Sequence, residues 1–253
     1  MTPKLWSLPY SPWSEKAKWA LDHCGVDYQK QRYEPLLGEP AMRWRTGRWR
    51  GPVSVPVLHC DDGWLTDSFD IATWAAAQAP AAGLMPPEWL ARVREANVQS
   101  ERGLAAGRAR SLVRLLGSRD GLRDMVPPAM RGPLGPLAVP IAAFGVRRTL
   151  RKYQRSVAGD AEQSLVEVLD RLRADLQAQG GSDTGLAYVL GRFSYADIAM
   201  AQVLGFVDPP ATHLRLTDAT RATFRDPELA PRYADLLRWR DALYREHRDR
   251  APS

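Results

Sequence analysis

Apolar and polar positions follow two different patterns along the chain. In the first part, short apolar runs alternate with segments of helical period. Lys4–Leu8 is a short apolar run that ends at Pro9, as expected for a strand. Ser14–Cys24 carries apolar residues at helical spacing, and Gly25 follows as a helix-ending residue. Val26–Tyr33 has the β-branched and aromatic content of a second strand. A strand, a helix and a strand in this order predict a parallel pair.

The next stretch predicts an antiparallel pair and another helix. Glu34–Pro52 is rich in Gly, Pro and Arg and is expected to form a loop with a short helix. Ser54–Cys60 and Gly63–Thr66 are short strand patterns joined by Asp61-Asp62-Gly63, a typical hairpin signal. Asp67–Gln78 then places apolar residues at helical spacing. The predicted order is β-α-β-α-β-β-α.

The pattern in the rest of the chain is helical throughout. Residues 79–87 are Pro, Ala and Gly with little else, and this change of composition predicts a domain boundary. We therefore expect an α/β domain at 1–79 and an all-helical domain at 88–253, with a Pro-rich apolar insert at about 118–153 that forms a lid or a subunit contact. The helical patterns after the boundary are Glu88–Leu116, Ile141–Arg155, Gly159–Gln179, Ser194–Phe206 and Pro227–Arg248.

Composition and charge narrow the possible partners. The apolar fraction of 45% and the charged fraction of 25% exclude global disorder. The net charge of +6 comes from arginines spread among acidic residues, which is not the stripe of a nucleic-acid-binding protein. Met42–Arg50 is the exception, with four arginines and two tryptophans that could stack on and pair with nucleic acid. A solvated loop or a pocket for small carboxylates explains this cluster more simply, so no nucleic-acid partner is expected.

The cysteines and histidines do not predict a metal site. Cys24 falls on the apolar face of the first helix and Cys60 at a strand end, so both are expected to be packed thiols. There is no C-x-x-C pair, and the four histidines lack ligand spacing, so we expect neither a disulfide framework nor a bound metal.

The most apolar window, Met125–Val146, is interrupted by five prolines and Arg131, so it predicts a helix-and-turn insert rather than a membrane span. Weak peripheral membrane contact through it is left open. The N-terminus lacks the pattern of a secretory signal, which favours the cytoplasm.

Val55-Pro56 stands at the start of a predicted strand. Proline cannot donate to the ladder, and a cis bond here would turn the N–H and C=O of Val55 toward an open edge where an extended peptide could pair. The alternative is an edge-strand proline that only ends the pairing.

Asp67-Ser68 stands where a helix begins. Unpaired N–H groups and the positive end of the helix dipole would favour a carboxylate bound at this position. The alternative is that Asp67 and Ser68 only cap the helix.

Three motifs in this order resemble those of the glutathione S-transferase superfamily. They are Leu8-Pro-Tyr-Ser-Pro-Trp-Ser-Glu-Lys16, the pair Val53–Leu58 and Leu65–Ile71, and Gly191-Arg-Phe-Ser-Tyr-Ala-Asp-Ile198. The resemblance implies a thioredoxin-like domain followed by an all-helical domain, glutathione as co-substrate without a metal, and a homodimer. The implied activity is conjugation or isomerisation of a small hydrophobic electrophile, as in detoxification. A protein of the same fold that binds glutathione or another ligand without turnover is the alternative.

The same resemblance assigns the glutathione contacts. Val55 and Pro56 would bind the cysteinyl backbone, and Asp67 and Ser68 the γ-glutamyl carboxylate and amino group. Ser54 stands where the family usually has Lys or Gln for the glycyl carboxylate. An arginine from the segment 43–50 is expected to replace that contact.

Three residues of the first motif are candidates for activating the thiol. Ser11 aligns best with the family's catalytic serine or cysteine and precedes the first helix. Ser14 is the second candidate, although its position also fits a plain N-cap. Tyr10 is the third, and is otherwise expected to line the pocket with Trp13. Serine in place of cysteine favours conjugation or isomerisation over mixed-disulfide chemistry.

The third motif is expected to be structural. Ser194-Tyr-Ala-Asp197 is a capping box with Asp in place of Glu, and Phe193 with Ile198 supplies the hydrophobic staple.

Overall fold

The computed structural model describes residues 1–33, 38–50, 53–126, 132, 137–154, 160–180 and 186–249. Its N-terminal part is built on one four-stranded sheet in the order β2-β1-β3-β4. The strands are β1 Lys4–Ser7, β2 Gln29–Arg32, β3 Val57–Cys60 and β4 Gly63–Leu65. β1 pairs parallel with β2 and antiparallel with β3, and β3 pairs antiparallel with β4. Both predicted pairings are confirmed.

Strand register brings three connections to one end of this sheet. Trp6 pairs with Val57, and Leu58 pairs with Leu65. The chain therefore leaves β1, enters β3 and leaves β4 at the same end, because antiparallel neighbours run in opposite directions.

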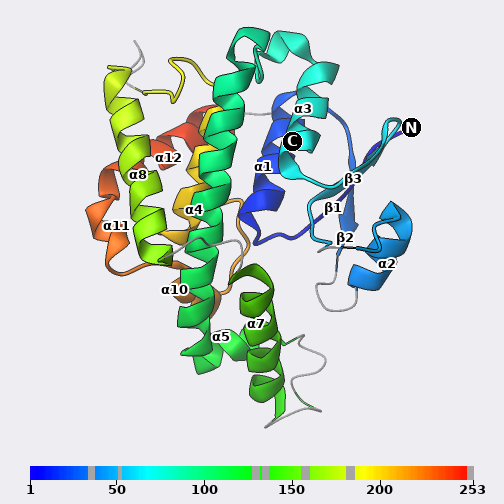
Figure 1. Cartoon of the computed structure of the whole chain (residues 1–253), viewed down its shortest axis with the longest axis vertical. Coiled ribbons are helices and arrows are strands. Elements are labelled where there is room, and N and C mark those ends of the chain that lie inside the picture. The colour runs from blue at the N-terminus through cyan, green and yellow to red at the C-terminus, as the bar shows by residue number, and fades with distance from the viewer. Residues whose placement is uncertain are drawn as a thin grey trace.

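Helices cover both faces of the sheet. α1 (Pro12–His23) and α3 (Ser68–Gln78) lie between the sheet and the remaining helices, and α2 (Gly38–Thr46) lies on the far side (Figure 1). Strand residues alternate accordingly: Leu5 and Leu58 belong to the main core, whereas Trp6 and Val57 belong to a smaller core that includes Met42 of α2.

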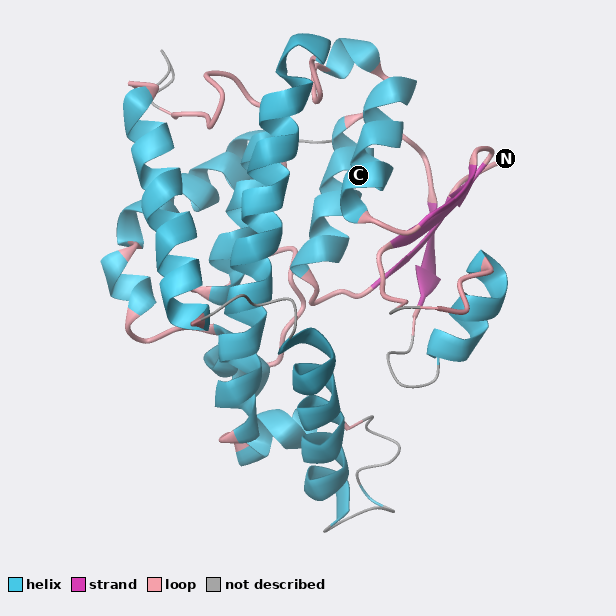
Figure 2. Cartoon of the chain, viewed as in Figure 1, coloured by secondary structure: helices cyan, strands magenta, loops and turns pink. Residues whose placement is uncertain are grey.

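The rest of the chain is helical. Figure 2 shows strands only in the N-terminal part, so the predicted thioredoxin-like α/β part followed by an all-helical part is confirmed for the residues described. None of the described helices is long and apolar enough to cross a membrane. The helices are α4 Leu90–Leu116, α5 Arg119–Asp124, α7 Ala138–Gln154, α8 Ala161–Ala178, α9 Tyr195–Val203, α10 Asp218–Phe224, α11 Leu229–Arg232 and α12 Ala234–His247, with 3₁₀ turns at Pro80–Ala82, Pro87–Trp89 and Leu204–Phe206.

Several predicted boundaries differ from the structure. The pattern at Pro227–Arg248 forms two helices, because the chain leaves helical geometry at Tyr233. α5 and α10 were not predicted, because six and seven residues are too few to establish a helical period. Within the expected insert at 118–153 the structure describes α5 and most of α7, while residues 127–131 and 133–136 lie outside the described residues.

Asp197 organises the start of α9, as the capping-box motif predicts. Its carboxylate accepts the N–H groups of Ser194 and Val189 at 2.9 and 2.7 Å and the Ser194 hydroxyl at 3.1 Å. Burial raises the pKa of Asp197 to about 7, while these hydrogen bonds act in the opposite direction. The loop before α9 thus depends on one buried carboxylate.

We expect Asp197→Ala to lower the free energy of unfolding by about 2–4 kcal/mol, because it leaves two backbone N–H groups buried without an acceptor. Asp218→Ala is the matched control, since Asp218 is also in the first turn of a helix but is exposed. Its cost should stay below about 1 kcal/mol. Urea unfolding of both variants measures the difference, and equal losses would contradict this role of Asp197.

Candidate functional site

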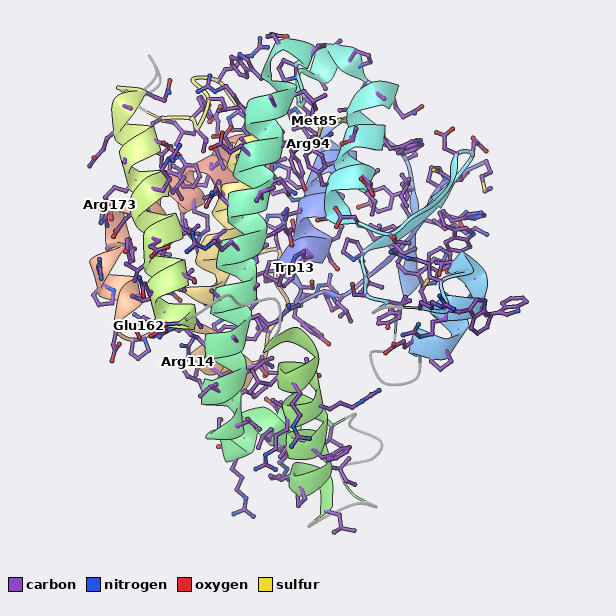
Figure 3. The ribbon with its side chains drawn as sticks, in the orientation of Figure 1. Trp13, Met85, Arg94, Arg114, Glu162 and Arg173 are labelled. Carbon is purple, nitrogen blue, oxygen red and sulfur yellow. The ribbon has the colours of Figure 1, made fainter. Side chains whose placement is uncertain are left out.

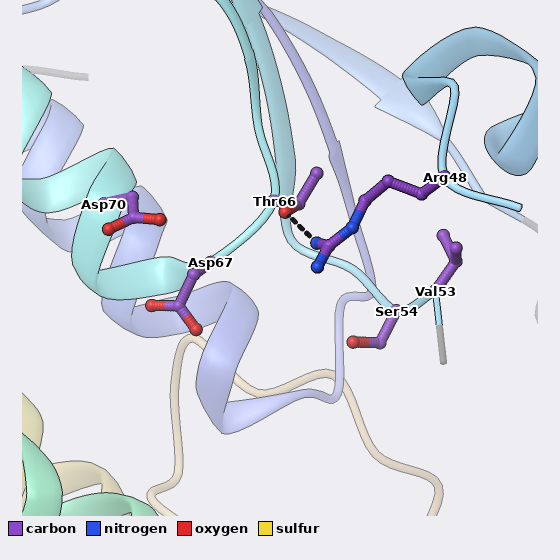
Figure 4. Close-up of a pocket in the computed structure, with 6 residues that line it drawn as sticks. All are labelled: Arg48, Val53, Ser54, Thr66, Asp67 and Asp70. Atoms are coloured by element: carbon purple, nitrogen blue, oxygen red, sulfur yellow. Dashed lines mark hydrogen bonds between the residues drawn. The ribbon is translucent and has the colours of Figure 1, made fainter. Parts of the chain in front are cut away.

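A polar cavity of about 310 Å³ opens at the end of the sheet where the three connections meet (Figure 4). Its wall comes from the segment before β3, the segment after β4, the first turn of α3, and the segment after α2. The lining residues are Arg48, Val53, Ser54, Thr66, Asp67 and Asp70. Two predicted binding residues, Ser54 and Asp67, therefore share one cavity.

The cavity carries opposite charges on its two sides. Arg48 donates a hydrogen bond to the Thr66 hydroxyl, and its guanidinium group is directed into the cavity (Figure 4). Asp67 and Asp70 stand on the other side, one helical turn apart. Desolvation and then the neighbouring charge of Asp67 raise the pKa of Asp70, while the charges of Arg94 and Arg48 act in the opposite direction. Such a cavity matches a zwitterionic ligand.

Val55-Pro56 lies beside this cavity at the entry to β3. The peptide bond between the two residues is cis. Both side chains are buried, and Val55 packs in the smaller core with Val53 and Val57. No hydrogen bond from another described residue reaches the Val55 backbone, so its N–H and C=O are available to a ligand.

The start of α3 is capped by a side chain that lines the cavity. The Asp67 carboxylate accepts the N–H of Phe69 at 2.7 Å, which makes Asp67 the N-cap. Ser68 is only 2% exposed, and its hydroxyl lies beside that of Tyr195 without a well-formed hydrogen bond to any described residue. Ser68 is therefore buried at the helix start and is not among the residues that line the cavity.

The three candidates for thiol activation occupy different environments. Ser11 is half-buried and caps α1, and its hydroxyl oxygen accepts the N–H of Ser14 at 3.4 Å. Ser14 is fully buried, and its hydroxyl accepts the N–H of Leu8 at 3.0 Å. Tyr10 is half-buried in the preceding turn. Of the two serines, only Ser11 is accessible to a ligand.

Trp13 lies between α1 and α4 and does not line the cavity (Figure 3). Its indole N–H donates to Glu101 at 2.7 Å, and the guanidinium of Arg108 stands 4.6 Å from the ring centroid. Glu101 also accepts from the fully buried Lys16 at 2.7 Å, and Lys16 donates to Asn97 at 2.8 Å. This contact fixes α1, and with it Ser11, against α4.

The cysteines are packed thiols, as predicted. Cys24 and Cys60 are both buried and free, and burial raises the pKa of each, for Cys24 to about 11. Across the part of the chain that the structure describes, no three His, Cys, Asp or Glu side chains form a group that could hold a metal ion.

Comparisons with known proteins identify this fold. Residues 10–78 match the glutathione S-transferase N-terminal domain family. The chain has the glutathione S-transferase fold. A glutathione transferase from Phanerochaete chrysosporium is 17% identical with a TM-score of 0.62, and the alignment covers all of both chains. One from Methylobacillus flagellatus, solved with glutathione bound, is 19% identical with a TM-score of 0.54, also over all of both chains. One from Methylobacterium radiotolerans, in complex with glutathione sulfonate, is 18% identical with a TM-score of 0.53 over 96% of this chain and 91% of that one. No curated protein sequence matches the chain.

The resemblance seen in the sequence is thereby confirmed. Within the glutathione S-transferase fold, the structure also identifies residues that the sequence did not predict. Arg48 was included only as part of the segment 43–50. Asp70 follows Asp67 at a spacing of three, which places both side chains on neighbouring parts of one helix face and could have predicted the pair. Lys16 gave no signal, because a lysine on a helix is usually exposed.

We expect Ser14→Ala to destabilise this glutathione S-transferase fold by about 1–2 kcal/mol, because the Leu8 N–H loses its acceptor in a half-buried loop. Ser11→Ala should cost less than about 1 kcal/mol, since the 3.4 Å capping bond is long. Denaturant unfolding of both variants tests the order. A larger loss for Ser11→Ala would contradict the structural role of Ser14.

Proposed function

We propose that this protein binds glutathione in the charged cavity and activates its thiol for attack on a small apolar electrophile. The observation that carries the proposal is the match between a zwitterionic, extended peptide and a cavity with an arginine on one side, two aspartates on the other, and an unpaired strand backbone beside it. Two structures of similar fold, those from Methylobacillus flagellatus and Methylobacterium radiotolerans, contain glutathione or its sulfonate.

The charges of the cavity suggest how glutathione lies. Its cysteinyl backbone pairs with the N–H and C=O of Val55, which extends the sheet by one short strand. The γ-glutamyl carboxylate meets the N–H of Ser68 at the helix start, and the ammonium group meets Asp67 and Asp70. The glycyl carboxylate meets Arg48, with Ser54 beside it. The ammonium group and the glycyl carboxylate then each meet an opposite charge, and the γ-glutamyl carboxylate meets a backbone donor.

Ser11 is the proposed activating residue. Its hydroxyl oxygen accepts the Ser14 N–H, which leaves the hydroxyl proton free to donate to the glutathione sulfur. That hydrogen bond and the N-terminus of α1 both favour the thiolate, so the thiol proton passes to water. The sulfur then forms a bond to an electrophilic carbon, and with an aryl halide the halide leaves with its bonding electrons. Isomerisation would use the same thiolate, which adds and later leaves.

The remaining assignments rest on the family. We assign residues 1–79 as the glutathione-binding domain and 88–253 as the domain that, with the insert at about 118–153, lines the site of the hydrophobic electrophile. A homodimer in which the first domain contacts the second domain of the partner completes the proposal.

Arg48→Ala should weaken glutathione binding about tenfold by removing a charged hydrogen bond to the glycyl carboxylate. Glutathione esterified at the glycyl carboxylate should bind the variant and the wild type equally well. Titration calorimetry with both ligands measures this, with Arg50→Ala as the control, since Arg50 is exposed in the same segment but does not line the cavity. Equal losses for both ligands would show that Arg48 does not meet that carboxylate.

Ser11→Ala should lower kcat for conjugation of glutathione to chlorodinitrobenzene about 100-fold, with little change in KM for glutathione. The pKa of the bound thiol should return toward about 8.5, which the ultraviolet absorbance of the thiolate reports. Ser118→Ala is the matched control, because Ser118 also caps a helix, α5, through its hydroxyl.

Retention of the wild type on immobilised glutathione, followed by an assay of turnover, distinguishes a transferase from a binding protein. Retention without turnover would leave a binding protein and reject the transferase. Failure to be retained would reject the glutathione site itself.

A further inference from the structure

α7 has two faces of unequal character. Its inner face carries Ala143 and Val146, which are buried against Leu115 of α4 and Leu122 of α5. This packing holds the helix at one end of the molecule, where it lies alongside α5 and the end of α4 (Figure 1).

The outer face of α7 begins with an exposed apolar stripe. Leu137, Ile141 and Phe144 are 61, 47 and 67% exposed, and their spacing of four and three places them in one row along the helix. From Leu137 to Val146 the chain contains no polar side chain at all. An exposed helix face normally carries polar residues, so this apolar stripe indicates a surface that binds a partner.

The same row continues into arginines. Arg148 and Arg151 follow Phe144 at spacings of four and three and are exposed, and Arg147 stands at the edge of the row. No acidic side chain among the described residues forms an ion pair with any of these three arginines. The outer face thus changes from apolar to cationic along a single line.

We infer that the outer face of α7, from Leu137 to Arg151, docks on an anionic phospholipid surface. The apolar residues enter the boundary between headgroups and acyl chains, and the arginines pair with lipid phosphates. The net charge of +6 favours approach to such a surface. This inference does not depend on glutathione binding.

The dimensions of the face favour a lipid surface over a second copy of the chain. A helix of this length is roughly 22 Å long and offers roughly 220 Å² to a partner, whereas a stable protein interface needs about 800 Å² from each side. Two copies would also bring the arginines of both faces together if their α7 helices packed parallel, or set them against the apolar residues if antiparallel, and neither arrangement supplies a described acid. A lipid surface needs neither a large fitted area nor acidic side chains.

Sedimentation of the full-length protein with vesicles tests this inference. We expect binding to vesicles of phosphatidylcholine and phosphatidylglycerol in equal amounts, and little binding to phosphatidylcholine alone. Ile141→Ser with Phe144→Ser should lower the partition coefficient more than about tenfold. Arg148→Glu with Arg151→Glu should lower it at least about tenfold on the mixed vesicles. All four side chains are exposed, so the fold should persist, which circular dichroism checks.

Matched controls separate this face from general electrostatics. Arg92→Glu with Arg238→Glu replaces two other exposed arginines. Each Arg→Glu replacement lowers the net charge by two, so this control and Arg148→Glu with Arg151→Glu both take it from +6 to +2. Trp44→Ser removes a 75% exposed aromatic residue beside arginines on α2. Both controls should sediment like the wild type.

Three results would overturn the inference. The first is no sedimentation of the wild type with the mixed vesicles. The second is an equal loss in either control, which would place the contact elsewhere or make it a non-specific charge effect. The third is a protein that does not bind vesicles but becomes smaller in solution when Ile141 and Phe144 are replaced, which would make the face a contact between copies.

Discussion

The site depends above all on the register in which β1, β3 and β4 pair. Trp6 opposite Val57 and Leu58 opposite Leu65 bring the exit of β1, the entry to β3 and the exit of β4 to one end of the sheet. A slip by one residue would exchange the side chains of these short strands between the two cores, so the packing of both cores protects the register. The segment with Pro56, the start of α3 and the loop that leads to α1 consequently begin at the same end of the sheet.

A second constraint fixes the helix that carries Ser11. The ammonium group of Lys16 is fully buried, and oxygens of α4 together with the face of the Tyr195 ring compensate for its lost hydration. A shift of α1 along α4 would leave that charge unpaired, and Trp13 adds a hydrogen bond to the same glutamate, Glu101. The interface therefore holds the first turn of α1 in a defined place relative to the sheet, as a site that must position a sulfur atom requires.

The hydrophobic pattern predicted the long helices, because runs of ten or more residues show their period clearly, and short β-rich runs with a hairpin turn predicted the sheet. The pattern did not predict α5 and α10, because they are too short to show a period. It also missed the helix end at Tyr233, which lies inside a continuous helical pattern. At the site, Asp67 was identified because a helix start leaves a sequence signature. The inward turn of the Ser68 side chain and the choice of Arg48 within its segment depend on packing between distant parts of the chain.

The central claim is that glutathione extends the sheet at Val55 with its charges matched by the cavity. A crystal structure of the protein grown with glutathione tests this most directly. We predict main-chain hydrogen bonds from the cysteinyl residue to the N–H and C=O of Val55, the ammonium group at Asp67 and Asp70, and the glycyl carboxylate at Arg48. Glutathione bound away from Val55, or a cavity that stays empty of it at saturating concentration, would contradict the account.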